Sequence, residues 1–277
     1  MSDALTDDLR LAHMLADAAD SITLDRFRAQ DLEVSLKADH TEVSDADQAV
    51  EQAIRRILST ARPRDGFHGE ESGDSGWGPR RWVVDPIDGT ANFVRGVPVW
   101  ATLIALLVDD IPVVSVVSAP SLARRWWAHD SGGAFTGKGL LNGRPIHVSG
   151  TTTVAESFLS YSSLNGWVRS GRGHQFGELL RQAKRTRGFG DFWSYMLVAE
   201  GAVDIATEPD LALHDMAALV PIVTEAGGRF TSIDGALGAS GPGALATNGR
   251  LHDEVLDLLA PIDDGEEDSL IIARRAL

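Results

Sequence analysis

The residues with the clearest chemistry lie in one short segment, Asp85-Pro86-Ile87-Asp88-Gly89-Thr90. An apolar run ends at two aspartates separated by a proline, and glycine and threonine then begin an expected helix. This order places carboxylate oxygens, the backbone carbonyl of Ile87 and helix N-terminal amides around one point. Hard divalent cations prefer oxygen ligands, and phosphate groups bind helix N-terminal amides. The segment therefore predicts a site for a divalent cation next to a phosphate group.

Three further acidic residues, Asp47, Glu70 and Asp215, are candidates to join this site. Each has a simpler explanation when it is taken alone. Ser44 and Asp47 match a capping box, Glu70 fits an exposed loop charge, and Asp215 fits the cap of a helix that starts at Met216. The two aspartates of the first segment also fit an ordinary turn. One shared site explains all five residues together, provided that the fold brings them into one place.

The bulk composition excludes several classes of function. The 277 residues include 25 basic and 40 acidic side chains, which gives a net charge of −15. Nucleic acids and anionic membranes need a basic surface, so neither is expected as a partner. The absence of cysteine excludes disulfides, thiolate zinc sites and a cysteine nucleophile. No export signal and no apolar run long enough to span a membrane are visible, so we expect a cytoplasmic enzyme.

The first part of the chain, residues 1–141, is predicted to be an amino-terminal subdomain that carries the acidic motif. Its apolar residues indicate two helices, then a segment that is mainly loop, then an antiparallel meander of strands. The expected helices are 5–27 and 44–59, the loop is 62–79, and the strands are 99–108, 113–119 and 125–129.

The second part, residues 142–262, is predicted to be a subdomain in which strands and helices alternate, which is typical of a sheet covered by helices. The acidic tail, 263–277, is expected to be disordered. The two parts together predict a mixed α/β (α+β) fold. The expected strands of the second part are 157–161, 202–207, 229–232 and 244–247, and its helices are 176–187, 191–200, 216–226 and 251–259.

Three motifs in this chain resemble the inositol monophosphatase family: Gly69-Glu70-Glu71-Ser72, Asp85–Phe93 and Asp215-Met216-Ala217-Ala218. The resemblance covers roughly residues 5–259. It implies a layered α-β-α-β-α sugar-phosphatase fold in which two sheets are sandwiched between helix layers. It also implies a Mg²⁺-dependent phosphomonoesterase with two to three Mg²⁺ per active site, a small-molecule phosphate monoester as substrate, and a homodimer.

The same resemblance implies a set of metal ligands. Glu70, Asp85 and the Ile87 carbonyl are expected to hold one Mg²⁺. Asp85, Asp88 and Asp215 are expected to hold a second, and Glu70 with water a third. Two cations about 4 Å apart can activate a water molecule and neutralise the leaving alkoxide.

Thr90 and Asp47 resemble the water-orienting pair of the family, although Thr90 alone also fits a plain helix cap. With Glu70, they are the expected catalytic residues. The amides of Gly89 and Thr90 are expected to bind phosphate oxygens, and Asp215 is expected to contribute to substrate binding as well as to metal binding.

The substrate alcohol is predicted from the residue after Gly190. Inositol-type members usually have a small or hydroxyl residue there, whereas this chain has Asp191, which resembles the actinobacterial histidinol-phosphatase branch. Histidinol phosphate carries an ammonium group that Asp191 and Glu208 can bind. Asp191 also fits a helix cap, and Glu208 is shared with inositol-type members. We expect hydrolysis of L-histidinol phosphate in histidine biosynthesis, with inositol 1-phosphate or another phosphate ester of the family as the alternative.

His214 departs from the family pattern, which usually has Trp before the metal-binding aspartate. We expect its ring to fill the same packing space, and a contact with substrate or metal-bound water is the alternative. A third hypothesis for the whole chain is a non-catalytic binding protein that keeps the fold. The presence of every metal-binding position opposes this hypothesis.

Overall fold

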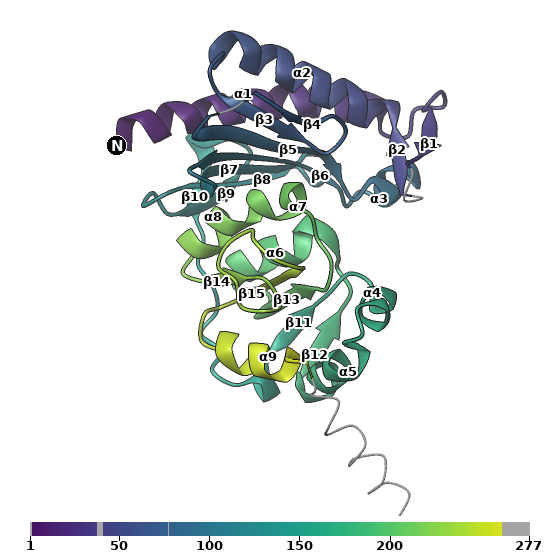
Figure 1. Cartoon of the computed structure of the whole chain (residues 1–277), viewed down its shortest axis with the longest axis vertical. Helices are drawn as coiled ribbons and strands as arrows, with labels where there is room; N and C mark the ends of the chain where they lie inside the picture. Colours follow the sequence, from purple (N-terminus) through teal and green to yellow (C-terminus); the bar gives the residue numbers. More distant parts are fainter. Residues whose placement is uncertain (1, 38–40, 77, 262–277) are drawn as a thin grey trace, which may run out of the picture.

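The computed structural model describes residues 2–37, 41–76 and 78–261, so the predicted acidic tail lies outside the described residues. Figure 1 shows the layers along the long axis of the molecule: a layer of helices, a sheet, a middle helix layer, a second sheet and an outer helix layer. The mixed α/β fold and the α-β-α-β-α arrangement are therefore confirmed.

The first layer consists of two long helices that cover one face of the main sheet, and of the hairpin that connects them. Apolar residues on one face of each helix, such as Leu15 and Ala19 in the first and Val50 and Ile54 in the second, are fully buried. Although the first helix is long, no helix among the described residues has the apolar character that crossing a bilayer requires. The bounds are α1 (Ser2–Arg26), β1 (Val34–Leu36), β2 (Glu42–Ser44) and α2 (Asp45–Ala61).

The main sheet contains eight strands within the described residues, in the order β10-β9-β8-β7-β6-β5-β3-β4. The predicted antiparallel meander is confirmed as β6, β7 and β8, whereas β3 pairs with β5 in parallel. Residues 82–87 of β5 are all buried, so its carboxyl end lies inside the molecule. The bounds are β3 (Gly66–Gly69), β4 (Gly73–Ser75), β5 (Arg80–Asp88), β6 (Ala101–Val108), β7 (Ile111–Ala119), β8 (Arg124–His129), β9 (Ala134–Gly137) and β10 (Arg144–Pro145).

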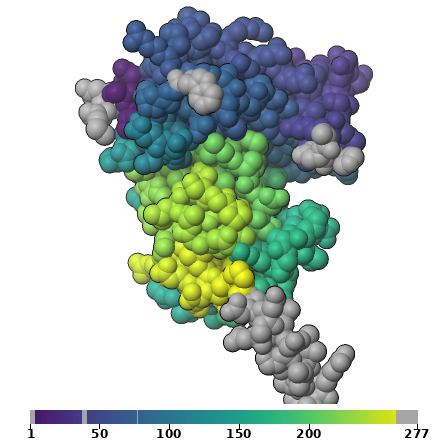
Figure 2. All heavy atoms as spheres, in the orientation of Figure 1, coloured from purple at the N-terminus to yellow at the C-terminus, as the bar shows by residue number. Residues whose placement is uncertain are grey.

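A middle layer of helices separates the two sheets. One core cluster combines Leu103 and Trp126 of the main sheet with Phe192 and Ile222 of these helices and Ala246 of the second sheet. The two halves share this core, and Figure 2 shows them in direct contact on one face. The division at 141/142 stays a prediction. The bounds are α6 (Asp191–Ala199), α7 (Leu213–Ala217) and α8 (Leu219–Glu225).

The second sheet has five strands among the described residues, in the order β12-β11-β13-β15-β14. Its outer face is covered by α4, α5 and α9, and α9 packs on both α5 and β15. The bounds are β11 (Phe158–Ser160), α4 (Leu164–Arg169), α5 (Gly173–Gln182), β12 (Arg185–Arg187), β13 (Ile205–Glu208), β14 (Arg229–Thr231), β15 (Ala244–Thr247) and α9 (His252–Leu259).

Two predictions about single elements fail because of strand pairing. The predicted loop 62–79 contains β3 and β4, because Phe67 is buried in the main sheet. The predicted helix 176–187 ends at Gln182, and the residues after Lys184 instead form β12, which pairs in parallel with β11. Tertiary pairing overrides local helix propensity here.

The predicted helix 216–226 is in fact two helices, α7 and α8, that are separated at Ala218. Pro221 lies in the first turn of α8, where its missing N–H removes the hydrogen bond that would otherwise continue the helix. The first of the two helices begins at Leu213, three residues before the predicted start. This earlier start places Asp215 within the first turn.

Candidate active site

The pairing of β5 with β6 is irregular between Asp85 and Asp88, at the carboxyl end of the strand. The intervening proline cannot donate to the sheet, and its carbonyl accepts the hydroxyl of Thr102 at 2.8 Å. Gly89 follows with φ of +85°, a left-handed conformation that glycine adopts at little cost. Helix α3 (Thr90–Val94) then begins. The predicted strand and helix are confirmed, whereas the two aspartates and the proline lie in the strand, and the turn comes at Gly89.

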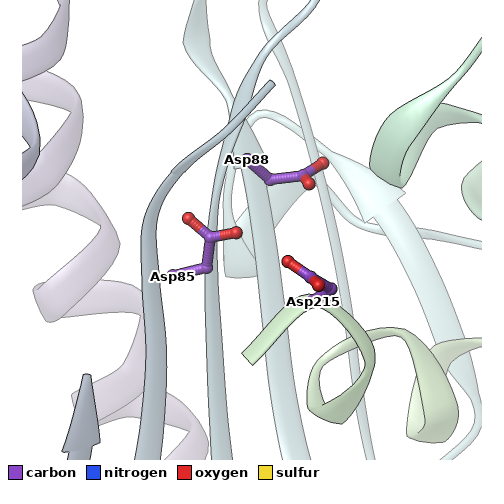
Figure 3. Close-up of side chains that lie close together, drawn as sticks. All are labelled: Asp85, Asp88 and Asp215. Carbon is purple, nitrogen blue, oxygen red and sulfur yellow. The ribbon is translucent and has the colours of Figure 1, made fainter. Parts of the chain in front are cut away.

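Three carboxylates, those of Asp85, Asp88 and Asp215, lie side by side (Figure 3). One oxygen atom of each lies within 4.8 Å of the other two. Asp215 comes from α7, which packs against β5, and its Oδ2 accepts the Ala212 N–H at 2.7 Å. Asp215 therefore supports its helix, as the simpler explanation held, and also belongs to the cluster.

The protein interior disfavours the charge on these carboxylates. Burial raises the pKa of Asp85 well above its usual range, and the charges of Glu70, Asp88 and Asp215 raise this pKa further. Burial also raises the pKa of Asp88 and of Asp215. Asp85 Oδ1 is buried without a hydrogen-bond partner among the described residues. A divalent cation fits this set of oxygens, because its charge would offset both burial and repulsion.

The charge of Glu70 acts on Asp85, and the Glu70 carboxylate is itself paired with a lysine. Lys37 Nζ lies 2.6 Å from Glu70 Oε1 and 2.7 Å from Glu71 Oε1. The lysine follows β1 in the hairpin between the first two helices. Its ammonium balances part of the negative charge that Glu70 and Glu71 bring to the site. No local signal in the sequence predicts this contact, because it depends on where the hairpin folds.

Asp47 and Thr90 lie next to each other, as their resemblance to a water-orienting pair implies. Asp47 Oδ1 is 3.3 Å from Thr90 Oγ1, which lies 2.9 Å from the Ile87 carbonyl oxygen. The other oxygen of Asp47 accepts the N–H and the hydroxyl of Ser44 at 2.8 and 2.6 Å, so the capping box also forms. Burial raises the pKa of Asp47 to about 6. The cap of α3 is Gly89 rather than Thr90, which leaves the threonine hydroxyl for the site.

Asp191 faces the cluster from the start of α6. It has φ of +50°, an uncommon conformation for a residue other than glycine. Asn92 Nδ2 donates to Asp191 Oδ2 at 3.0 Å and to the Val99 carbonyl at 2.9 Å. Burial, with the charge of Asp215, raises the pKa of Asp191 to about 6. The sequence analysis missed Asn92 as the residue that orients this carboxylate.

Capping does not account for Asp191. The cap position of α6 is Gly190, and no side-chain cap bond forms there. The next backbone amide, that of Phe192, donates to Asp88 Oδ2 at 2.7 Å. The first turn of α6 therefore binds the Asp88 carboxylate through a backbone amide and also carries the Asp191 carboxylate.

Glu208 lies at the end of β13 and is 8% exposed. Burial, together with the charges of Asp191 and Asp215, raises the pKa of Glu208 to about 8. Burial raises the pKa of the Tyr195 hydroxyl above its usual range, and the nearby charge of Glu208 raises this pKa further. Glu208 is thus near enough to Asp88, Asp191 and Asp215 for their charges to interact, although it does not line the cavity described below.

His214 packs against a second histidine that the sequence analysis did not assign to the site. Its ring stacks on that of His68, with ring centres 5.9 Å apart and an angle of 22° between the planes. Its Nε2 is 3.7 Å from Asp215 Oδ1. His68 in turn contacts Asp74, with Nδ1 and Oδ1 2.9 Å apart. His214 thus has a packing partner and also borders the cluster.

A cavity of about 780 Å³ opens over these groups. It is large enough for a small phosphate ester together with bound cations. Its wall combines Asp215 of the acidic cluster with the hairpin and with the loop that precedes α7. The lining residues from the predicted site are Glu70, Gly89, Thr90, Asp191 and Asp215.

Comparisons with known proteins agree on one family. The sequence model described as the inositol monophosphatase family matches residues 5–263. Proteins named histidinol-phosphatase from Streptomyces coelicolor and Mycobacterium tuberculosis are 59% and 54% identical, over 91% of this chain in both cases and 97% and 98% of their own lengths. The solved structure of an inositol monophosphatase from Zymomonas mobilis matches with a TM-score of 0.81 and 35% identity, over 92% of this chain and 98% of that chain.

Proposed function

The chain belongs to the inositol monophosphatase family, and from this premise we propose that it hydrolyses L-histidinol phosphate to L-histidinol and phosphate with the help of Mg²⁺. The observation that carries the proposal is the cluster of Asp85, Asp88 and Asp215, in which a buried oxygen has no partner. The high identity to relatives named histidinol-phosphatase supports the choice of substrate.

We propose the set of metal ligands that the family resemblance implies, and the cluster of Asp85, Asp88 and Asp215 supports it. Asp85 would take part in two sites, one with Glu70 and the Ile87 carbonyl and one with Asp88 and Asp215, and Glu70 would hold a third cation with water. Bound Mg²⁺ would supply the Lewis acidity that activates water and neutralises the leaving alkoxide. Oxygen ligands of this kind are those that Mg²⁺ prefers.

The residues of the chain itself would place the reactants. Thr90 and Asp47 would orient the attacking water through the threonine hydroxyl. The buried Asp47 carboxylate would accept the proton that the water loses. The amides of Gly89 and Thr90 would hold phosphate oxygens. Asp191 and Glu208 would bind the ammonium of the substrate, and the positive charge would relieve the repulsion between the two carboxylates.

A panel of substrates tests the proposal directly. Purified protein with Mg²⁺ should release phosphate from L-histidinol phosphate with a higher kcat/KM than from inositol 1-phosphate or fructose 1,6-bisphosphate. Phosphate release in the presence of a chelator should fall to background. Efficient turnover of inositol 1-phosphate without turnover of L-histidinol phosphate would replace the proposal with its alternative, an inositol-1-phosphate phosphatase.

We further propose that the enzyme works as a homodimer, as the family resemblance implies, and that it acts in the cytoplasm. A biosynthetic phosphatase with a soluble substrate fits that compartment. Light scattering coupled to size exclusion should give twice the 29.7 kDa mass of one chain.

Cation binding should stabilise the fold more at high pH than at low pH. The folded metal-free protein holds protons on Asp47, Asp191 and Glu208 up to about pH 6, 6 and 8, whereas the unfolded chain loses them near pH 4. The metal-free protein therefore becomes less stable as pH rises through this window. The pKa values of Asp85, Asp88 and Asp215 are also raised, so a rise in pH removes the protons that compete with the cation for these carboxylates. Mg²⁺ at about 100 times its Kd adds about 2.7 kcal/mol, or roughly 5–10 °C in Tm.

The measurement is the difference in Tm with and without Mg²⁺ at about pH 6 and about pH 8. The difference is preferred to the raw Tm because the pKa of His13 and that of His252 are lowered by burial to about 4, and these groups act in the opposite direction. We expect the larger Mg²⁺-dependent shift at the higher pH. Equal shifts at both values would contradict the assignment of the cation to the acidic cluster.

A further inference from the structure

One face of α2 presents three polar side chains, at spacings of four residues, to different parts of the site region. Asp47 meets Thr90, as described above. One helical turn further on, Glu51 meets the segment that carries the acidic pair of Glu70 and Glu71. One more turn along, Arg55 donates to the hydroxyls of two serines in the adjoining β4 hairpin, at 2.8 and 3.3 Å. Through Glu51 and Arg55, α2 is thus hydrogen-bonded to the segment that joins β3 and β4.

Of the three contacts just described, the one that Glu51 makes is to the backbone. It is 3% exposed, and its Oε2 accepts the Glu71 N–H at 2.9 Å. A carboxylate at this depth is costly to bury, and one hydrogen bond to an amide only partly offsets that cost. Neither the proposed chemistry nor the packing of apolar residues uses this group.

The absence of a side chain at Gly69 provides the space for Glu51. A Cβ at Gly69 would lie 2.3 and 2.7 Å from the two oxygens of Glu51 and 2.4 Å from Cδ. Gly69 does not have a left-handed φ, so the glycine is required by space rather than by conformation. The Glu51 carboxylate therefore lies directly against the backbone at residue 69 and is hydrogen-bonded to the backbone at residue 71.

Glu70 lies between these two contact points. Its own N–H donates to the Val84 carbonyl at 3.2 Å, one residue before Asp85. The backbone of Glu70 is thus fixed from α2 on one side and from β5 on the other. The direction in which the Glu70 carboxylate leaves the backbone depends on both supports.

We propose that Glu51 is a positioning residue for cation binding, which holds the backbone on either side of Glu70 so that its carboxylate reaches the cation site next to Asp85. Groups that orient a ligand typically change metal affinity by about 10- to 100-fold when they are removed. The inference rests on the proposed function for the assignment of a cation to Glu70, but not on the identity of the substrate.

Calorimetric titration of the full-length protein with Mg²⁺, in the absence of substrate, tests this role. Glu70→Gln should remove one Mg²⁺ site. Glu51→Ala should lower the Mg²⁺ affinity of that same site by about tenfold or more. Glu51→Gln should weaken it by only about two- to fivefold, because the amide oxygen can still accept the Glu71 N–H. In the Glu70→Gln background, Glu51→Ala should leave the affinity of the remaining sites unchanged. Raising the Mg²⁺ concentration should restore kcat to Glu51→Ala.

A matched control separates positioning from simple stability. The carboxylate of Glu225 accepts the N–H groups of Ser131 and Gly133 at 2.9 and 2.7 Å, in a turn that carries no residue of the site. Glu225→Ala should lower Tm but change the Kd for Mg²⁺ by less than about twofold. If Glu51→Ala behaves in the same way as this control, the inference is wrong. If the wild-type protein binds no Mg²⁺ at all, the proposed function fails as well.

A steric test uses the space at Gly69. Gly69→Ala should weaken Mg²⁺ binding by about tenfold, because the new methyl group displaces the Glu51 carboxylate. In the Glu51→Ala background the same substitution should have little further effect, since the colliding atoms are gone. Independent, additive losses from the two substitutions would show that Glu51 and Gly69 do not act through one contact.

Discussion

Replacing Asp85 with asparagine should lower kcat for phosphate release by at least about 10³-fold at saturating Mg²⁺. Asn keeps the shape of the side chain but removes the charge at the centre of the carboxylate cluster. Asp85 is 2% exposed and is the residue expected to contact two cations at once. Each cation contributes several kcal/mol to the transition state, and about 1.4 kcal/mol corresponds to a factor of ten in rate.

The same substitution should leave the metal-free fold at least as stable as before. Repulsion from Glu70, Asp88 and Asp215 disappears when Asp85 loses its charge, so Tm in the presence of a chelator should stay equal or rise. Asp110→Asn, at an exposed turn, is a suitable control and should preserve kcat. A loss of less than about tenfold for Asp85→Asn would contradict the two-cation account.

The second large effect is expected at Asp191, and it concerns selectivity rather than rate in general. Asp191→Asn should lower kcat/KM for L-histidinol phosphate by about 10- to 100-fold, because a charge-assisted hydrogen bond to the ammonium contributes about 1.5–3 kcal/mol. Asn tolerates the left-handed backbone at this position and can still accept from Asn92. The local geometry should therefore survive the substitution.

The comparison substrate decides the interpretation. An analogue of L-histidinol phosphate without the amino group should be hydrolysed by Asp191→Asn with a kcat/KM close to that of the wild type. The Kd for Mg²⁺ should also stay close to the wild-type value, because the Phe192 amide still holds Asp88. If both substrates lose activity equally, Asp191 supports the metal centre and does not recognise the ammonium.

The part of the site that was predictable from sequence is the part built locally. The strand, the turn at Gly89 and the helix at Thr90 follow from residues adjacent in the chain, and the structure has them in that order. The convergence of Asp215 with Asp85 was not predictable from spacing alone. It came from the family resemblance, which supplies tertiary information that one sequence does not contain.

The contacts that were missed all cross between elements. Glu51 is visible as a residue four positions after Asp47, but nothing local indicates that this helix face meets the backbone at Glu71. Asn92 contacts Asp191 across 99 positions of sequence. The segment after Gln182 reads as helix because its neighbours are polar and helix-compatible, and only pairing with β11 makes it a strand.

The first turn of α6 separates two tasks within two consecutive residues. Phe192 serves Asp88 through its main-chain N–H, a group that every residue except proline possesses, whereas Asp191 acts through its side chain. The chemical identity at position 191 can therefore be exchanged without altering the support of Asp88. Under the proposed function, such a division would let position 191 change the preferred alcohol while the main-chain support of Asp88 stays the same.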